Sequence, residues 1–245
     1  MEFGVQGRVA IVTGAAHGIG RAICRALAGA GVGVWAVDIL DEGVAETAAV
    51  VAGAGGTCRA AVADLTDSAA VRALVERIAA REGRIDILVN SAGGVRGQVG
   101  RPIEEISDDD WAAIVQANLS ATFYTCRAVA PAMKARRFGR IVNISSGAGR
   151  SVSLTGIQAY ASAKAGQIGL TRQLAHELGP WNITVNTIAP GFIRSNPATE
   201  RQWEALGEEG QRRLVESLAL RRLGTPGDIA GGVLYFVSDL AAWVT

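Results

Sequence analysis

The sequence predicts an α/β protein with one doubly wound parallel sheet of about six to seven strands, helices on both faces and a helical substrate lid. Three observations support this prediction. Short, near-continuously apolar runs alternate with longer Ala-rich runs, as is typical of parallel strands covered on both faces. A glycine-rich turn follows the first apolar run. No repeat, low-complexity linker or composition break divides the 245 residues, so we expect one domain over 1–245.

The predicted elements alternate along the chain, which implies right-handed crossovers between neighbouring strands. The predicted strands are residues 8–14, 33–38, 57–64, 85–90, 139–145 and 183–190. The predicted helices are residues 18–30, 41–53, 67–81, 107–136, 157–178 and 226–239. Pro131 should kink or end the fourth of these helices, because proline lacks an amide hydrogen and clashes with the preceding turn.

A polar segment over residues 192–222 interrupts the alternation between the sixth strand and the last helix. It follows the carboxyl end of a strand, where open α/β sheets bind their ligands. Insertions of this length are often lids over a binding site. We therefore expect a substrate lid; the alternative is a surface helical pair with no gating role.

Composition argues against several functional classes. The formal net charge of +1 does not favour nucleic acid, and no apolar run reaches the roughly 20 residues that cross a bilayer. The cysteines, Cys24, Cys58 and Cys126, lack CxxC spacing, and only His17 and His176 accompany them, so we expect no metal site and no disulfide framework. The first residues lack the basic and apolar regions of a signal peptide. These features predict a reduced, cytoplasmic protein that binds neither nucleic acid nor membranes.

The glycine-rich turn "TGAAHGIG" occupies residues 13–20, between the first strand and the first helix. Glycine at positions 14, 18 and 20 lets backbone approach a pyrophosphate closely, and the helix start offers free N–H groups and positive dipole character. We therefore expect a nucleotide to contact this turn. The predicted contacts are Gly14, His17, Gly18, Ile19 and Gly20.

Asp38 ends the second strand, 18 residues after Gly20. A carboxylate there accepts hydrogen bonds from both ribose hydroxyls of NAD and repels the 2′-phosphate of NADP. His17 complicates this prediction, because a partly protonated imidazole tolerates a phosphate, and Asp38 is also suited to a simple turn. We expect NAD, with NADP less favoured.

Polar and small residues at two further strand ends are consistent with a cofactor edge. Asp64 and Leu65 follow the third strand, and Asn90, Ala92 and Gly93 form a small-residue floor after the fourth. We expect these residues to contact adenosine and ribose. Each also has a structural interpretation, since Asp64 suits a helix cap and the glycines suit a chain turn.

Chemistry is expected where the fifth strand ends and the next helix begins. Tyr160 and Lys164 are four residues apart on one helix face, with Cβ atoms roughly 6 Å apart, and Ser146 precedes them at the strand end. A nearby ammonium and an oxidised nicotinamide would lower the phenol pKa from its reference of about 10, so that Tyr160 acts as general base or acid. Ser146 would hydrogen-bond the substrate oxygen as charge develops.

Two other functional classes compete with this interpretation. The sequence lacks the residues needed for hydrolysis by a serine nucleophile. It has no GxSxG elbow, and His176 is expected on a helix surface. A nucleotide-binding redox sensor or scaffold without turnover remains an alternative. A protein without turnover would need neither the tyrosine nor the lysine, and this chain keeps both.

Several motifs of this sequence, in their order along the chain, resemble those of one family, the short-chain dehydrogenases/reductases with a Rossmann fold. They are "TGAAHGIG" for TGxxxGxG, "NSAG" at 90–93, "NL" at 118–119, "ISS" at 144–146, "YASAK" for YxxxK and "NTIAPG" at 186–191. The resemblance covers nearly the whole chain. It implies an oxidoreductase that interconverts a secondary alcohol and a ketone, in a homotetramer or dimer.

The resemblance also implies a role for individual residues. The catalytic set would be Asn118, Ser146, Tyr160 and Lys164, with Asn118 holding a water that relays protons from Lys164; Asn118 also suits a helix kink. Ser145 is the alternative to Ser146, because the interval to Tyr160 is one residue longer than usual. Lys164 would bind the nicotinamide ribose. The remaining cofactor contacts would be Pro190, Gly191, Ile193 and Ser195.

The substrate is the least determined part of the prediction. Apolar residues near the insertion favour a cyclic or aryl secondary alcohol or ketone, and several arginines suit a carboxylate on it. The candidate substrate contacts are Arg96, Ser153, Gln158, Phe192 and Trp203. The candidate arginines are Arg96, Arg150, Arg194, Arg201, Arg212 and Arg213.

Overall fold

The computed structural model describes residues 3–245, which form a six-stranded parallel sheet in the order β3-β2-β1-β4-β5-β6. This confirms the predicted fold class. The strands are β1 (Val9–Thr13), β2 (Gly33–Asp38), β3 (Cys58–Val62), β4 (Ile87–Asn90), β5 (Gly139–Ile144) and β6 (Ile183–Ile188). The strand order reverses between β1 and β4, and the carboxyl edge at such a reversal is where open α/β sheets bind their ligands.

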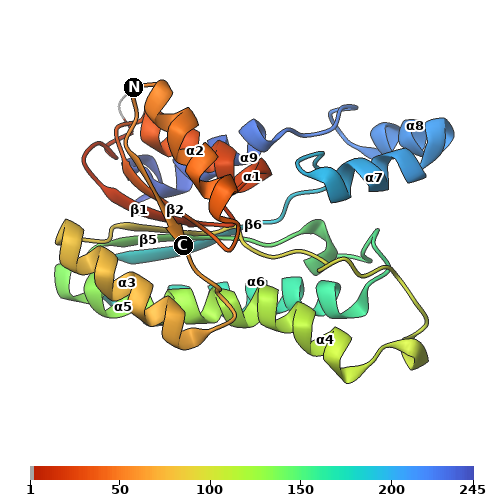
Figure 1. Ribbon diagram of the computed structural model, residues 1–245, viewed down its shortest axis with the longest axis horizontal. Helices are drawn as coiled ribbons and strands as arrows, with labels where there is room; N and C mark the ends of the chain where they lie inside the picture. The colour runs from red at the N-terminus through yellow and green to blue at the C-terminus, as the bar shows by residue number, and fades with distance from the viewer. Residues whose placement is uncertain (1–2) are drawn as a thin grey trace.

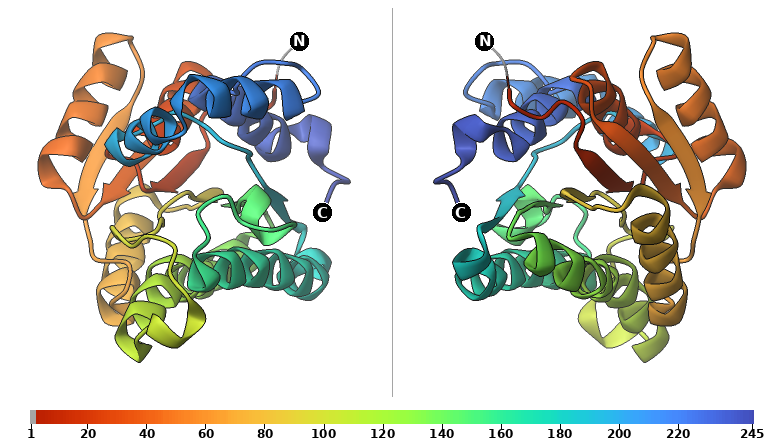
Figure 2. Two further views of the ribbon diagram at one scale, coloured as in Figure 1. Left: turned by 90° about the vertical axis from the view of Figure 1, so that its right-hand side faces the viewer. Right: turned by 90° about the vertical axis from the view of Figure 1, so that its left-hand side faces the viewer.

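Helices cover both faces of the sheet (Figures 1 and 2). On one face lie α1 (Gly18–Gly29), α2 (Asp41–Gly53) and α9 (Pro226–Val237). On the other lie α3 (Ser68–Glu82), α5 (Ala121–Arg136) and α6 (Gln158–Leu178). One apolar cluster fills each interface, and the strands contribute alternate residues to the two clusters. The central strands β1 and β4 are buried throughout and are apolar except at their last residue, which is the pattern that predicted them.

The helix predicted over residues 107–136 is interrupted. It consists of α4 (Asp108–Val115), a π-helical turn over Gln116–Ser120 and α5. At the turn, Asn118 Nδ2 donates to Ile114 O at 2.8 Å, so a side chain satisfies a carbonyl of the preceding turn. Pro131 does not end the helix, because α5 continues through it to Arg136.

The insertion after β6 contains two further helices, α7 (Pro197–Ala205) and α8 (Gly207–Ser217). A capping box of Asn196 and Thr199 fixes the start of α7, with Pro197 at its first position. Neither helix contains a fully buried residue. Figure 1 shows both helices standing beyond the carboxyl edge of the sheet. Within residues 3–245 no helix has the length and hydropathy needed to span a bilayer.

Candidate active site

The glycines of the turn after β1 are needed for contacts within the protein itself. A Cβ at Gly20 would lie 2.0 Å from Gly14 O, and one at Gly14 would lie 2.7 Å from the backbone of Ala92. Gly14 and Gly18 also have positive φ, at 67° and 56°. The turn is therefore drawn tightly against the start of α1 and the loop after β4, where a side chain does not fit.

The start of α1 has the properties of an anion site. His17 is the N-cap residue, is exposed and makes no side-chain capping bond. The first-turn N–H groups of Ile19 and its neighbours therefore lack a side-chain cap, and the helix dipole favours negative charge beside them. A dinucleotide pyrophosphate fits this donor set.

Asp38 lies at the end of β2, beside the glycine-rich turn. Its Oδ2 accepts a hydrogen bond from Ala16 N at 3.2 Å, and its Oδ1 accepts from the backbone N–H groups of Ile39 and Leu40. These bonds hold the carboxylate in place and leave acceptor capacity on Oδ2. Among the described side chains, no lysine, arginine or histidine forms an ion pair with it.

The residues expected after β3 and β4 occupy different environments. Asp64 is exposed and accepts from both the backbone and the hydroxyl of Thr66, and these bonds lower the pKa of its carboxyl group. It does not cap α3, which Asp67 does instead. Leu65 is buried. Asn90 is buried with its amide turned inward, so only its backbone remains for a cofactor contact.

The two serines at the end of β5 face different partners. Ser145 is buried, and its hydroxyl donates to Lys164 O at 2.8 Å, which ties β5 to α6. Ser146 Oγ accepts from Ala148 N at 3.2 Å, and its hydroxyl lies near enough to the Tyr160 phenol to lower the phenol pKa. Geometry therefore brings Ser146, and not Ser145, to the phenol. Burial raises the Tyr160 pKa above its ordinary value, and the Ser146 hydroxyl acts in the opposite direction.

Lys164 is the most perturbed base in the site. Its side chain is buried, with 4% of the residue exposed, and Nζ donates to Ile144 O at 2.9 Å. Nζ also lies 5.7 Å from the centre of the Tyr160 ring. Burial lowers the Lys164 pKa to about 7, because no carboxylate compensates for the lost hydration of the ammonium. The lysine and tyrosine are thus adjacent, as their spacing predicted.

Asn118 joins the loop after β4 to this pair. Its Oδ1 accepts from Gly94 N at 3.0 Å, and its Nδ2 donates to Gly94 O at 2.9 Å. A Cβ at Gly93 would lie 2.4 Å from Asn118 Oδ1 and 3.5 Å from Lys164 Nζ. The amide therefore fixes the two glycines against the lysine.

The segment after β6 returns to the glycine-rich turn. Pro190 O accepts from Gly147 N at 2.7 Å, and a Cβ at Gly18 would lie 2.5 Å from Ser195 O. Ile193 is buried and forms a parallel bridge with Gly224. The structure thus brings this segment against both ends of the predicted site.

An aromatic and charged stack links the insertion to this segment. The rings of Phe192 and Trp203 are stacked, with centroids 6.1 Å apart. The Arg194 guanidinium lies 5.4 Å from the Trp203 ring and is held by Glu200 at 2.7 Å. Arg194 is therefore engaged within the insertion, as Arg213 is through its pair with Glu209.

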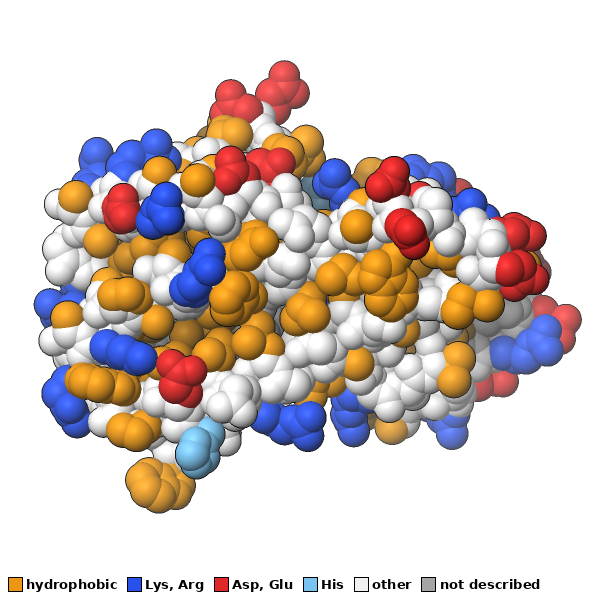
Figure 3. All heavy atoms as spheres, turned by 90° about the horizontal axis from the view of Figure 1, so that it is seen from below, with side chains coloured by type: hydrophobic (Ala, Val, Ile, Leu, Met, Phe, Trp, Pro, Cys, Tyr) orange, Lys and Arg blue, Asp and Glu red, His pale blue; other side chains and the backbone are white. Residues whose placement is uncertain are grey.

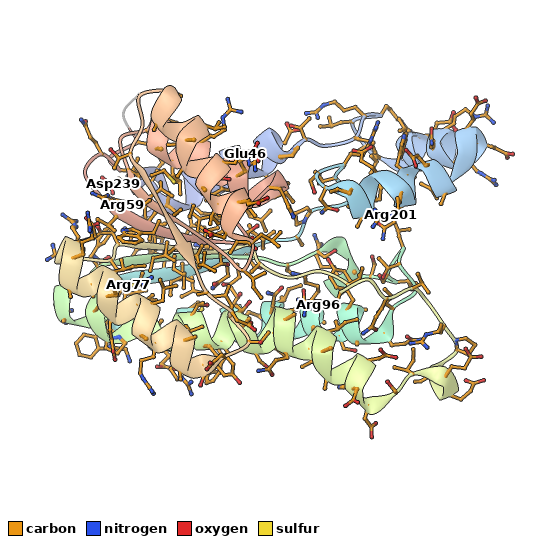
Figure 4. The ribbon with its side chains drawn as sticks, in the orientation of Figure 1. Glu46, Arg59, Arg77, Arg96, Arg201 and Asp239 are labelled. Carbon is orange, nitrogen blue, oxygen red and sulfur yellow. The ribbon has the colours of Figure 1, made fainter. Side chains whose placement is uncertain are left out.

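The other candidate substrate residues lie on loops at the same edge. Arg96 is exposed with φ of 52°, and Figure 4 places it across from Arg201 of α7. The Ser153 hydroxyl is 2.7 Å from that of Thr155. Gln158 Nε2 donates to Arg101 O at 3.0 Å, while its buried Oε1 has no partner.

The sequence did not predict a polar network of buried side chains that lies beneath the site. Asn143 of β5 is fully buried, accepts from Asn90 Nδ2 at 2.9 Å and donates to the Thr171 hydroxyl at 2.9 Å. Thr125 Oγ1 donates to Asn90 Oδ1 at 2.7 Å. The available signal was an asparagine inside an otherwise apolar strand, "RIVNIS". This network fixes the carboxyl ends of β4 and β5 against α5 and α6.

The small residues around Lys164 serve close packing. A Cβ at Gly166 would lie 2.7 Å from the Leu119 side chain, and one at Gly149 would lie 2.6 Å from the Lys164 backbone. Ala159 and Ala163 are buried. The helix is therefore in tight contact with the π-helical turn and with the loop after β5.

Comparison with known proteins places the chain among its relatives. The family model for short chain dehydrogenases matches residues 8–205. The chain belongs to the short-chain dehydrogenase family. Among curated members, it is 38% identical to D-threitol dehydrogenase of Mycolicibacterium smegmatis over 99% of this chain and 90% of that protein. It is 37% identical to the 3-oxoacyl-[acyl-carrier-protein] reductase FabG of Escherichia coli over 98% and 93%.

Solved structures of this short-chain dehydrogenase family show the same fold. NAD⁺-bound xylitol dehydrogenase matches with a TM-score of 0.91 and 31% identity, covering 98% of this chain and 96% of that one. Actinorhodin polyketide ketoreductase with NADPH matches with a TM-score of 0.89 and 32% identity, covering 97% and 93%. The family thus includes members bound to either nicotinamide cofactor.

Proposed function

We propose that the protein is an NAD(H)-dependent oxidoreductase that interconverts a secondary alcohol and a ketone, with Tyr160 as general acid and base. The observation that carries the proposal is the convergence of three side chains at one sheet edge. The Tyr160 phenol has the Ser146 hydroxyl beside it and the buried Lys164 side-chain nitrogen 5.7 Å from its ring centre. Proton transfer at the oxygen of an alcohol or ketone requires an acid–base group, which a phenol supplies, and it is assisted by a hydroxyl donor and a nearby cation.

In the oxidation direction, Tyr160 Oη accepts the proton of the substrate hydroxyl while Ser146 Oγ hydrogen-bonds the same oxygen. Burial raises the Tyr160 pKa, so the phenolate needs positive charge nearby, and Lys164 supplies it when protonated. A bound oxidised nicotinamide would supply the hydride acceptor, and its positive charge before hydride transfer would favour the phenolate. In reduction, Tyr160 returns the proton to the carbonyl oxygen.

In our proposal, Asn118 contributes to this chemistry by positioning the residues around Lys164. Both ends of its amide are bonded to Gly94, which places Gly93 against Lys164. This contact limits the orientations open to the lysine ammonium. The water-mediated relay from Lys164 stays a prediction.

Asp38 supports NAD as the cofactor. Its carboxylate is held by three backbone N–H groups and retains an acceptor for a ribose hydroxyl. The neighbouring Arg21, which would suit a 2′-phosphate, is paired with Glu46 at 2.7 Å. We expect kcat/KM to favour NAD, and Asp38→Ala to raise the NADP/NAD ratio by about 10–100-fold. Asp41→Ala is the matched control; a wild-type preference for NADP would contradict the assignment.

For the substrate, we propose a cyclic or aryl secondary alcohol or its ketone beneath a lid formed by residues 192–222. The stacked Phe192 and Trp203 favour a flat apolar group, and the exposed Arg96 and Arg201 lie on the loop after β4 and on α7. The absence of fully buried residues in α7 and α8 is consistent with movement. Linear polyols and 3-oxoacyl thioesters belong in the same screen, because relatives carry such names.

The test of the proposed reaction is a substrate screen followed by substitution of the tyrosine. Tyr160→Phe removes the proton donor and acceptor, so kcat/KM should fall by roughly 10²–10⁴-fold. Tyr124→Phe removes a phenol on α5 outside the site and should leave kcat/KM about unchanged. Undiminished activity of Tyr160→Phe would rule out the mechanism. Cofactor binding without turnover of any substrate would instead favour a sensor or scaffold.

We further propose a cytoplasmic homo-oligomer. Figure 3 shows apolar side chains gathered on the face seen from below Figure 1. Trp111 of α4 and Phe123 of α5 are 43% and 41% exposed. Contiguous patches of exposed apolar side chains are typical of association surfaces. Sedimentation equilibrium tests the proposal, and a monomer at micromolar concentration would contradict it.

A further inference from the structure

Two cysteines that are distant in the sequence meet in the fold. Cys24 lies in the middle of α1 and is fully buried, and Cys58 is the first residue of β3 and is partly exposed. Both belong to the apolar cluster between the sheet and the layer of α1, α2 and α9. The two thiols lie close enough for each to shift the pKa of the other.

The neighbouring residues have the register that this pairing requires. A Cβ at Gly56 would lie 2.9 Å from Ala28 Cβ, so the chain entering β3 touches α1 there. Ala28 is one helical turn after Cys24, about 6 Å along the helix, and Gly56 is two residues before Cys58, about 7 Å along an extended chain. Because helix and strand run in opposite directions, these steps bring Cys58 opposite Cys24.

The two thiols are chemically unequal. Contact with the Cys24 thiol lowers the Cys58 pKa below its ordinary value, and the Ala36 N–H and the Arg59 charge act in the same direction. The same contact, together with burial, raises the Cys24 pKa. Cys58 is also the accessible member, because β3 is an edge strand of the sheet. Nucleophilic attack therefore starts at Cys58.

We propose that Cys58 and Cys24 form a reactive dithiol, in which Cys58 attacks a low-molecular-weight disulfide and Cys24 resolves the product to an internal disulfide. In the first step, the Cys58 thiolate forms a mixed disulfide and releases one thiolate. In the second step, Cys24 loses its proton and attacks the Cys58 sulfur, which forms the Cys24–Cys58 bond and releases a second thiolate. The external disulfide is reduced to two thiolates, and the protein loses two thiol hydrogens.

This proposal is independent of the oxidoreductase activity. The bond would join α1, which begins at the glycine-rich turn, to β3, which leads to Asp64. Oxidation would thus tie together the two elements that carry opposite parts of the predicted cofactor edge. No step involves Tyr160 or Lys164, so the dithiol can be tested without any substrate.

The test treats the folded, reduced protein with 5,5′-dithiobis(2-nitrobenzoate) and follows the released chromophore. Wild type should release two equivalents and lose about 2 Da after the reagent is removed. Trypsin without reductant should then link peptide 22–25, which contains Cys24, to peptide 26–59, which contains Cys58. This peptide result needs no variant.

Three alanine variants separate the roles of the thiols. Cys24→Ala should release one equivalent and retain the mixed disulfide, while Cys58→Ala should react at least about 10-fold more slowly than wild type. Cys126→Ala is the control and should match wild type, because burial raises the Cys126 pKa to about 12. A stable mixed disulfide on wild-type Cys58, or the absence of the linked peptides after complete reaction, would overturn the proposal.

Discussion

The buried ammonium of Lys164 should make the stability of the cofactor-free protein rise with pH. Burial lowers the pKa of Lys164 to about 7 in the folded state, whereas an unfolded lysine titrates near 10.5. Between these values the unfolded chain holds a proton that the folded protein lacks. The penalty for burying the charge is thus fully present below about pH 7 and disappears as the pH rises toward 10.5.

The magnitude follows from this difference in bound protons. One proton gives a slope of about 1.4 kcal/mol per pH unit, so the free energy of unfolding should rise by about 2.7 kcal/mol between about pH 7.5 and 9.5. The Tyr160 phenol adds little in this window, because burial raises its pKa above the ordinary value. Urea unfolding at a series of pH values measures the slope.

Two methionine variants isolate the contribution of this lysine. Lys164→Met fills the same space without a titrating group and should lose the rise, while the pH dependence from Cys58 and other groups stays in both proteins and cancels in the comparison. Lys134→Met removes a surface lysine, which lies 3.4 Å from Glu177, and should keep the wild-type slope. Equal slopes in wild type and Lys164→Met would refute the reasoning.

Two further predictions concern the cofactor turn and the polar network beneath it. Gly18→Ala places a Cβ 2.5 Å from Ser195 O at a residue with positive φ, so the cofactor Kd from fluorescence titration should rise by at least about 10-fold. Gly29→Ala, which has open space around it, should keep the Kd within about two-fold of wild type. Similar affinities for both variants would contradict the argument. Thr125→Val leaves the buried Asn90 Oδ1 without its donor at 2.7 Å, so the free energy of unfolding measured by urea denaturation should fall by about 1–3 kcal/mol. A loss under about 0.5 kcal/mol would show that this hydrogen bond is dispensable.

The sequence was most informative where structure depends on neighbouring residues. Apolar runs predicted each strand to within a few residues, because parallel strands covered by helices on both faces are rich in apolar residues. The last helix begins as its sequence indicates, since Thr225 and Asp228 form a capping box around Pro226. Helical spacing alone placed Tyr160 and Lys164 on one face.

The sequence was least informative where the position of a side chain depends on contacts with a segment that is distant in the sequence. The sequence suggested a helix kink at Asn118, but only the fold shows that its side-chain amide bonds Gly94, 24 residues earlier. No local pattern distinguishes the inward Ser145 from Ser146, because the distinction depends on how α6 packs against β5.

For this protein, the sequence by itself determined the sheet, the glycine-rich turn and the spacing of the tyrosine and lysine, because these follow from short-range periodicity and sterics. Only the tertiary structure decided the partners and protonation of buried groups. The pKa of Lys164 is set by burial that no neighbour in the sequence reveals, and Cys24 meets Cys58 only because α1 packs over the sheet. Burial and long-range contact arise when elements pack, so they are properties of the folded chain.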